Sequence, residues 1–217
     1  MVKIASSILS ADLLKIKDEV INVDKAGIDY IHIDIMDGHY VPNITFGPNI
    51  VKSLRKVTQK ILDVHLMISP VESFVQEFID SGSDIISIHP EADDNSKQII
   101  KTIKKSGCKA GIAIHPNIEI DKIKEYLEEI DQVIVMTVLP GFGGQNFMES
   151  QISKIQNLYS MRKNLKNKFD IEIDGGINFD NCRAAIEAGA NILVSGTTIF
   201  KSNNGDIKKN INLLKLK

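Results

Sequence analysis

The stretch "YIHIDIM" at residues 30–36 indicates how this chain folds. Read as a β-strand, it has an isoleucine at every second position on one face, and His32, Asp34 and Met36 on the other. Polar residues are expected on a strand with one solvent-exposed face. On a strand that is covered on both faces, they require an explanation because burying an unpaired polar group is costly. The elements before and after this stretch therefore decide what its two faces contact.

Short β-branched runs of this kind recur along the chain and alternate with stretches of helical pattern. Strands that alternate with helices form right-handed βαβ units around a parallel sheet. Glycines suited to a helix C-cap end helical patterns at Gly27, Gly82, Gly107 and Gly189. The helical stretches include residues 11–27, 69–82, 95–107 and 120–130. The strand-like runs are KIASSIL (3–9), YIHIDIM (30–36), ILDVHLM (61–67), DIISIH (84–89), CKAGIAIH (108–115), QVIVMTV (132–138), FDIEID (169–174) and NILVSG (191–196).

The number of units predicts how the sheet closes. Eight strand–helix units in 217 residues give about 27 residues per unit, at the compact end of the (β/α)₈ barrel range. A doubly wound sheet is the alternative, but it usually has fewer strands and a glycine-rich turn after the first one. Here "SILSADLL" (7–14) follows the first run instead. We therefore predict an α/β protein with a single (β/α)₈ TIM-barrel domain over residues 1–217.

Composition and charge argue against several classes of protein. Hydrophobic residues make up 43% of the chain, enough for a sizeable core, and the net charge of −2 provides no basic footprint for nucleic acid or anionic membranes. No apolar run is long enough to span a bilayer, and the first residues lack the features of a signal peptide. Cys108 and Cys182 lie far apart, which favours a reducing compartment and a cytoplasmic location. A single disulfide between them is the alternative.

Polar side chains gather at one end of the predicted barrel. The inward faces of the second, third and seventh strands carry His32, Asp34, His65 and Asp174 near the carboxyl ends, where barrel enzymes keep their chemistry. A lone inward His or Asp is more often a hydrogen-bonded core residue. Two adjacent carboxylates repel unless a cation lies between them, so this quartet favours a divalent metal site. Its mixed ligands suit zinc, iron, manganese or cobalt alike.

Three further histidines receive no chemical role from the sequence. His39 lies in a loop, whereas His89 and His115 follow the fourth and fifth strands and so lie near the same end of the barrel. Each of the latter two could be a structural residue or a partner of a ligand.

Glycine-rich segments follow the last three strands. They are "PGFGGQNF" (140–147), "DGGIN" (174–178) and "SGTTIF" (195–200). Glycine lets bare backbone N–H groups approach an anion, and the loops after strands 7 and 8 of barrels often bind phosphate. A single such segment would more often be a turn. The pair formed by the last two predicts a phosphate cradle of Gly175, Gly176, Gly196 and Thr197. The first segment is long enough to be a lid over the substrate.

Seven motifs fall in one order along nearly the whole chain. They are SSILSAD (6–12), HIDIMDGHYVPNITFGP (32–48), DVHLM (63–67), HPEA (89–92), MTVLPGFGGQNF (136–147), IDGGI (173–177) and VSGTTIF (194–200). Together they resemble the ribulose-phosphate 3-epimerase family. The resemblance implies an isomerase of carbohydrate metabolism that acts in the pentose phosphate pathway. It would interconvert D-ribulose 5-phosphate and D-xylulose 5-phosphate by two-carboxylate proton transfer through a metal-stabilised 2,3-enediolate.

The resemblance also implies the partners and the site. It implies one divalent metal ion, a small-molecule sugar-phosphate substrate and a homo-oligomer. Asp34 and Asp174 match the acid/base pair, with Asp34 taking the proton from ribulose 5-phosphate and Asp174 donating one. The metal ligands match His32, Asp34, His65 and Asp174. Substrate contacts match Ser7, His65, Gly141, Phe142, Gly143, Gly144, Asp174, Gly175, Gly176, Gly196 and Thr197, and a wall beside the reacting carbons matches Met36, Met67 and Met136.

Two departures and three alternatives accompany this interpretation. Ser6 stands where the family typically has proline, and Leu139 where a polar residue is usual before "PGFGG". A sister epimerase of a six-carbon ketose phosphate, such as allulose 6-phosphate, would use the same quartet. Related barrel lyases carry an Asp-x-Lys-x-x-Asp run on the third strand, where this chain has His65 and Ile68 in place of the lysine and the second aspartate. A non-catalytic sugar-phosphate binder is the third alternative.

Overall fold

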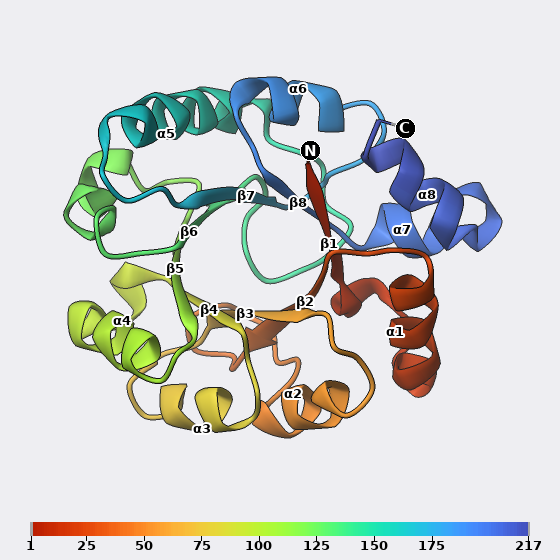
Figure 1. The fold of residues 1–217 in the computed structure, drawn as a ribbon, viewed down its shortest axis with the longest axis horizontal. Helices are drawn as coiled ribbons and strands as arrows, with labels where there is room; N and C mark the ends of the chain where they lie inside the picture. Colours follow the sequence, from red (N-terminus) through yellow and green to blue (C-terminus); the bar gives the residue numbers. More distant parts are fainter. Residues whose placement is uncertain (1, 217) are drawn as a thin grey trace.

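The computed structural model describes residues 2–216, and within them eight parallel strands close into a barrel (Figure 1). Each strand pairs with the next along the chain, and the first pairs with the eighth. The predicted (β/α)₈ barrel is therefore confirmed. The strands are β1 (Lys3–Ser7), β2 (Tyr30–Met36), β3 (Ile61–Met67), β4 (Ile85–Ile88), β5 (Lys109–Ile114), β6 (Gln132–Met136), β7 (Asp170–Asp174) and β8 (Ile192–Ser195).

Helices surround the ring of strands on its outer side (Figure 1). The stretch 120–130 was predicted as a helix of the same kind as the others, but it forms the 3₁₀ helix η4 (Ile120–Tyr126). The α-helices are α1 (Ile16–Lys25), α2 (Pro48–Arg55), α3 (Val75–Asp80), α4 (Ser96–Lys105), α5 (Ile152–Asn164), α6 (Cys182–Ala188), α7 (Thr197–Lys201) and α8 (Ile207–Leu214). The remaining 3₁₀ turns are η1 (Ile8–Ser10), η2 (Leu13–Lys15), η3 (Pro90–Ala92), η5 (Glu149–Gln151) and η6 (Ser202–Gly205).

The outward faces of the strands form the main core. Ile31 and Ile33 of β2 and Leu62 and Val64 of β3 are completely buried and belong to the cluster that packs under the helices. Burial of one such side chain contributes roughly 1.5–3 kcal/mol relative to exposure. The apolar half of the alternating pattern therefore drives the strands against the helix layer, and the other half must point into the barrel.

The interior of the barrel changes in character along its axis. A cluster of Ala5, Tyr30, Ile85, Ile192 and Val194 lies inside it, and Lys3 donates hydrogen bonds to the Tyr30 hydroxyl and to Asp170 at the amino-terminal end. Above this cluster, the register of β2 on β3 pairs His32 with Asp63, Asp34 with His65, and Met36 with Met67. Parallel pairing thus brings the polar residues of two strands to the same levels of the barrel, near its carboxyl end.

The glycines predicted to end helices have the backbone conformation that this role requires. Gly27, Gly82, Gly107 and Gly189 all have positive φ values, between 86° and 119°. An L side chain is strained in this region, so glycine lets the chain turn from each helix toward the next strand.

No helix within residues 2–216 has the length and apolar character needed to cross a membrane. Cys108 and Cys182 are free thiols.

Candidate metal centre and substrate cavity

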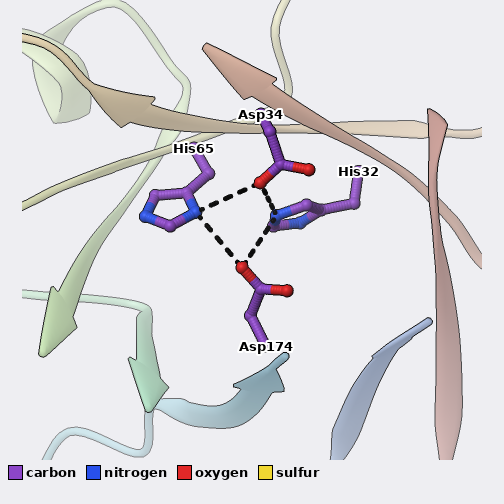
Figure 2. A group of neighbouring side chains, drawn as sticks. All are labelled: His32, Asp34, His65 and Asp174. Atoms are coloured by element: carbon purple, nitrogen blue, oxygen red, sulfur yellow. Dashed lines mark ion pairs between the residues drawn. The ribbon is translucent and has the colours of Figure 1, made fainter. Parts of the chain in front are cut away.

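The structure brings the four residues of the predicted quartet together inside the barrel. Figure 2 shows the carboxylates of Asp34 and Asp174 facing each other across the imidazoles of His32 and His65. The Nε2 atom of His32 lies 3.4 Å from Asp34 Oδ1 and 3.8 Å from Asp174 Oδ2. The Nδ1 atom of His65 lies 3.6 Å and 3.5 Å from the same two oxygens. One atom from each residue thus faces a common point.

The geometry and chemistry of this cluster fit a divalent metal ion. His32 Nε2 and His65 Nδ1 are buried and have no hydrogen-bond partner, an arrangement that is costly for polar atoms unless something else binds them. Atoms that share one ion at about 2.1 Å lie roughly 3–4 Å from one another. The four candidate ligand atoms all lie within 4.8 Å of one another. The cluster could therefore hold a metal ion through two nitrogens and two oxygens.

The electrostatics of the cluster hold the carboxylate of Asp34 charged. Burial alone would raise the pKa of Asp34, but the charge of His32 and contacts with both histidines hold that pKa well below its usual range. Burial alone would likewise lower the pKa of His32, yet Asp34 and Asp63 raise it well above the ordinary value. The pKa of His65 is also raised, because its contacts with Asp174 and Asp34 outweigh burial. Positive charge is therefore favoured next to Asp34, and either protonated imidazoles or a bound metal ion can provide it.

Each imidazole has a buried partner on its far side. His32 Nδ1 lies 2.7 Å from Asp63 Oδ2, and His65 Nε2 lies 2.9 Å from His89 Nε2. Asp63 and His89 are completely buried. Burial lowers the pKa of His89 to about 4, against which its contact with Glu91 has a smaller effect, so this ring is neutral near pH 7. Partners of this kind orient the ring of a metal-ligating histidine.

A cavity of about 250 Å³ opens beside the cluster at the carboxyl ends of the strands. It brings together almost all the residues predicted to contact a substrate. His65 is the exception, because its side chain is buried and does not form part of the cavity wall. The predicted residues in the wall are Ser7, Asp34, Met36, Met67, Met136, Gly141, Phe142, Gly143, Gly144, Asp174, Gly175, Gly176, Gly196 and Thr197.

The glycines of the predicted phosphate cradle lie where no side chain would fit. A Cβ at Gly176, which has a φ of 67°, would lie 2.6 Å from the backbone nitrogen of Phe147. A Cβ at Gly196 would lie 2.5 Å from Ser10 Oγ, and one at Gly175 would meet Val138 at 2.5 Å. These contacts are shorter than any Cβ tolerates, so close packing of the loops around the cavity requires glycine here.

The connection after β6 covers part of the cavity. In Figure 1 this blue-green segment reaches over the middle of the ring of strands. Gln145 Nε2 donates hydrogen bonds to the carbonyls of Leu139 and Phe142, both at 2.7 Å, and Asn43 Nδ2 donates to the carbonyl of Gly141 at 2.7 Å. The segment is thus folded on itself and tied to the connection after β2, although Leu139 and Phe142 expose more than half of their side chains.

The three methionines surround the cavity from two sides. Met36 and Met67 pack together with Val41, whereas Met136 packs with Ala113, Ile134 and Val138 in a separate cluster. All three are almost completely buried and belong to the cavity wall. They give the floor of the cavity apolar surface next to the two carboxylates.

Sequence reasoning did not single out some residues that the structure places at the site. Ser10 lines the cavity and its hydroxyl lies 3.3 Å from Thr197 Oγ1. Asn146 and Asn178 also line it, and no spacing or periodicity marked them in advance. For His89, whose sequence position allows a structural residue or a partner of a ligand, the structure shows contact with His65. His39 is exposed, as its predicted loop position implies.

A barrel with a buried His/Asp cluster and a glycine-lined cavity at the carboxyl ends of its strands is the arrangement of a TIM-barrel enzyme with a metal-compatible centre. Residues 3–200 match the family model described as the ribulose-phosphate 3 epimerase family. The chain belongs to the ribulose-phosphate 3-epimerase family.

Relatives of known sequence agree with this assignment. The chain is 46% identical to the ribulose-phosphate 3-epimerase of Bacillus subtilis, over 92% of this chain and 93% of the relative. It is 45% identical to the chloroplastic ribulose-5-phosphate-3-epimerase of Arabidopsis thaliana, over 91% and 71%. Among solved structures, KGPDC from Streptococcus mutans superposes with a TM-score of 0.71 at 15% identity, covering 100% of this chain and 98% of that one. At this identity the similarity concerns the fold alone.

Proposed function

We propose that this chain interconverts D-ribulose 5-phosphate and D-xylulose 5-phosphate, with Asp34 and Asp174 as the two acid/base groups. The observation that carries the proposal is the convergence of these carboxylates from β2 and β7 on one buried cluster beside the cavity. Membership of the ribulose-phosphate 3-epimerase family supports the choice of substrate.

Epimerisation at C3 of a 2-keto sugar removes a proton from one face and returns one to the other. Two acid/base groups on opposite sides of a planar 2,3-enediolate can do this. Asp34 takes the proton from ribulose 5-phosphate and Asp174 delivers one, and the roles exchange in the reverse direction. Ser7 Oγ donates a 2.7 Å hydrogen bond to Asp34 Oδ2, which orients that carboxylate.

A divalent ion held by His32, Asp34, His65 and Asp174 would stabilise the negative charge that develops on the substrate oxygens at C2 and C3. Zinc, iron, manganese and cobalt all suit these ligands. The three methionines exclude water from the reacting carbons, which protects the enediolate from stray protonation.

The far end of the cavity suits the phosphate of the substrate. Gly175, Gly176 and Gly196 have no side chains that would keep a phosphate from backbone N–H groups, and Thr197 begins the short helix α7. The segment around Gly141 closes over the bound sugar and, with Ser7, contacts it.

The decisive test is turnover in deuterated water with each metal ion in turn. We expect xylulose 5-phosphate to form from ribulose 5-phosphate with deuterium at C3, and both to be lost when the metal is removed. Product without label would exclude proton transfer, and binding without turnover would favour the non-catalytic alternative. A higher kcat/KM for allulose 6-phosphate than for ribulose 5-phosphate would favour the six-carbon epimerase.

Three further features belong to the same proposal: the cytoplasmic location rests on the two distant cysteines, the single domain on the number of strand–helix units, and the homo-oligomer on the family resemblance. The chain acts in the cytoplasm, it works as one domain over residues 1–217, and it associates into a homo-oligomer. Light scattering of the purified protein measures the last of these, and a monomeric mass would contradict it.

A further inference from the structure

His89 contacts the quartet from outside. It follows β4 directly, is completely buried, and its Nε2 lies 2.9 Å from Nε2 of His65. The two rings are stacked, with centroids 5.1 Å apart and planes inclined by 29°. Within the described residues, neither Nε2 atom makes another hydrogen bond. This contact therefore decides where the proton of His65 lies.

Two ring nitrogens can share one hydrogen bond only if one carries a proton and the other offers a lone pair. His65 Nδ1 faces the carboxylates of Asp34 and Asp174 and must offer a lone pair if it is to bind an ion. The proton of neutral His65 then lies on Nε2 and is donated to His89 Nε2. The proton of His89 consequently lies on its Nδ1.

The chain of contacts continues from His89 to the protein surface. His89 Nδ1 lies 3.5 Å from Glu91 Oε1, and the hydroxyl of Tyr40 donates a 2.8 Å hydrogen bond to the same oxygen. The ring of Tyr40 also packs on His89, with centroids 4.6 Å apart. Glu91 thus provides a negative charge opposite the Nδ1 proton of His89, and Tyr40 holds that carboxylate in place.

We propose that His89 is a positioning residue, which together with Glu91 and Tyr40 holds His65 in the tautomer that directs its Nδ1 lone pair at the metal centre. The inference rests on the metal site of the proposed function and extends it. The two histidines of the quartet are then oriented by different partners, since His32 contacts the carboxylate of Asp63 and His65 contacts a second imidazole.

Titration of the metal-free full-length protein with Co²⁺ tests the proposal, with the dissociation constant and the visible Co²⁺ spectrum as readouts. His89→Leu removes the acceptor, whereas His89→Gln keeps a carbonyl oxygen that can accept from His65. We expect His89→Leu to weaken Co²⁺ binding about 10–100-fold and to alter the spectrum, and His89→Gln to stay within about threefold of the parent. Unchanged binding by His89→Leu, or equal losses in both variants, would overturn the proposal.

A second pair of variants keeps the test valid if His89→Leu does not fold. Glu91→Gln removes the charge opposite His89 from a side chain that is already 32% exposed. Asp94→Asn removes a charge from an exposed side chain on the same connection and is the matched control. We expect several-fold weaker Co²⁺ binding for Glu91→Gln alone, and no difference between the two variants would overturn the proposal.

Co²⁺ binding by the parent protein shows whether a negative result overturns only the positioning role of His89 or also the proposed metal site. If it binds Co²⁺ and Asp174→Asn abolishes binding while the His89 and Glu91 variants have no effect, only the positioning role is wrong. If the parent does not bind Co²⁺, the metal site of the proposed function and this inference are both overturned.

Discussion

His32 Nδ1 lies 2.7 Å from Asp63 Oδ2, at a completely buried level beneath the candidate metal centre. Gln132 Nε2 donates to the other oxygen of Asp63 at 3.1 Å, and Glu172 Oε1 lies 3.2 Å from the same nitrogen of His32. A histidine held through Nδ1 presents Nε2 to its other neighbours. The carboxylate of Asp63, which lies one layer below the site, therefore fixes the orientation of the His32 ring.

Replacing either acid/base candidate should remove turnover and leave the fold intact. We expect Asp34→Asn and Asp174→Asn to lower kcat by about 10²–10⁴-fold or more, because an amide cannot exchange the substrate proton. Asp180→Asn, which changes an exposed carboxylate on the connection after β7, is the matched control and should retain full activity. A near-native rate for Asp174→Asn would rule out its assigned role.

Removal of the metal should lower both activity and stability. An ion that binds the folded protein alone stabilises it by about 2.7 kcal/mol at 100 times its dissociation constant. We therefore expect chelation to abolish turnover and to lower Tm, and re-addition of one divalent ion to restore both. His65→Ala should lose the metal-dependent part of Tm, and a Tm that still rises with metal in this variant would place the ion elsewhere.

Gly176→Ala should lower catalytic efficiency, an effect that backbone strain alone would not produce. Its Cβ would lie 2.6 Å from the backbone of Phe147, next to the candidate phosphate cradle. Gly107→Ala is the matched control, because Gly107 also has positive φ but nothing lies within 4 Å of its Cβ. We expect both variants to lose roughly 1–2 kcal/mol of stability from backbone strain, and Gly176→Ala to lose more because its Cβ overlaps the backbone of Phe147. Only Gly176→Ala should lose kcat/KM, by roughly 10²-fold. Equal kinetics for the two variants would contradict the cradle.

Glu172 and Asp63 should respond to substitution in opposite ways in metal-free protein. Burial and the charge of Asp63 raise the pKa of Glu172 well above 4.5, so the folded protein keeps a proton that the unfolded chain releases above that pH. Wild-type stability is therefore lost as the pH rises above 4.5, and Glu172→Gln should gain stability relative to wild type over the same range. Urea unfolding from pH 5 to 8 measures this difference, and a difference that falls with pH would show that Glu172 is charged in the fold.

The pKa of Asp63 is shifted in the opposite direction to that of Glu172, so its contribution to stability should change with pH in the opposite way. Burial would raise its pKa, but the charge of His32 and contacts with its neighbours hold that pKa below 3.8. The stability that charged Asp63 provides is present above pH 3.8 and is lost as the pH falls through the lowered pKa. Asp63→Asn should therefore destabilise the protein near neutral pH, and its effect should shrink in strong acid.

Much of the fold and of the quartet could be predicted from local patterns. The alternation in residues 30–36 assigned His32 and Asp34 to an inward face, because side chains on a strand repeat every two residues. One element that departed from prediction is η4, where an apolar pattern compatible with an α-helix formed a 3₁₀ helix instead. Periodicity alone does not distinguish these two hydrogen-bonding schemes over a short stretch. The helices predicted over 11–27 and 69–82 are also shorter in the structure, as α1 (Ile16–Lys25) and α3 (Val75–Asp80).

The sequence by itself determined the closed barrel, the inward faces and the residue types at the carboxyl end, because these depend on periodicity, on the number of units and on motif order. Only the tertiary structure decided which inward residues share a level and which of their atoms face one another. The pairing of His65 with His89, and the burial of His65 behind the cavity wall, depend on the register of β3 on β4 and on the turn that follows β4. Register and closure arise from contacts between distant segments, which no local pattern contains.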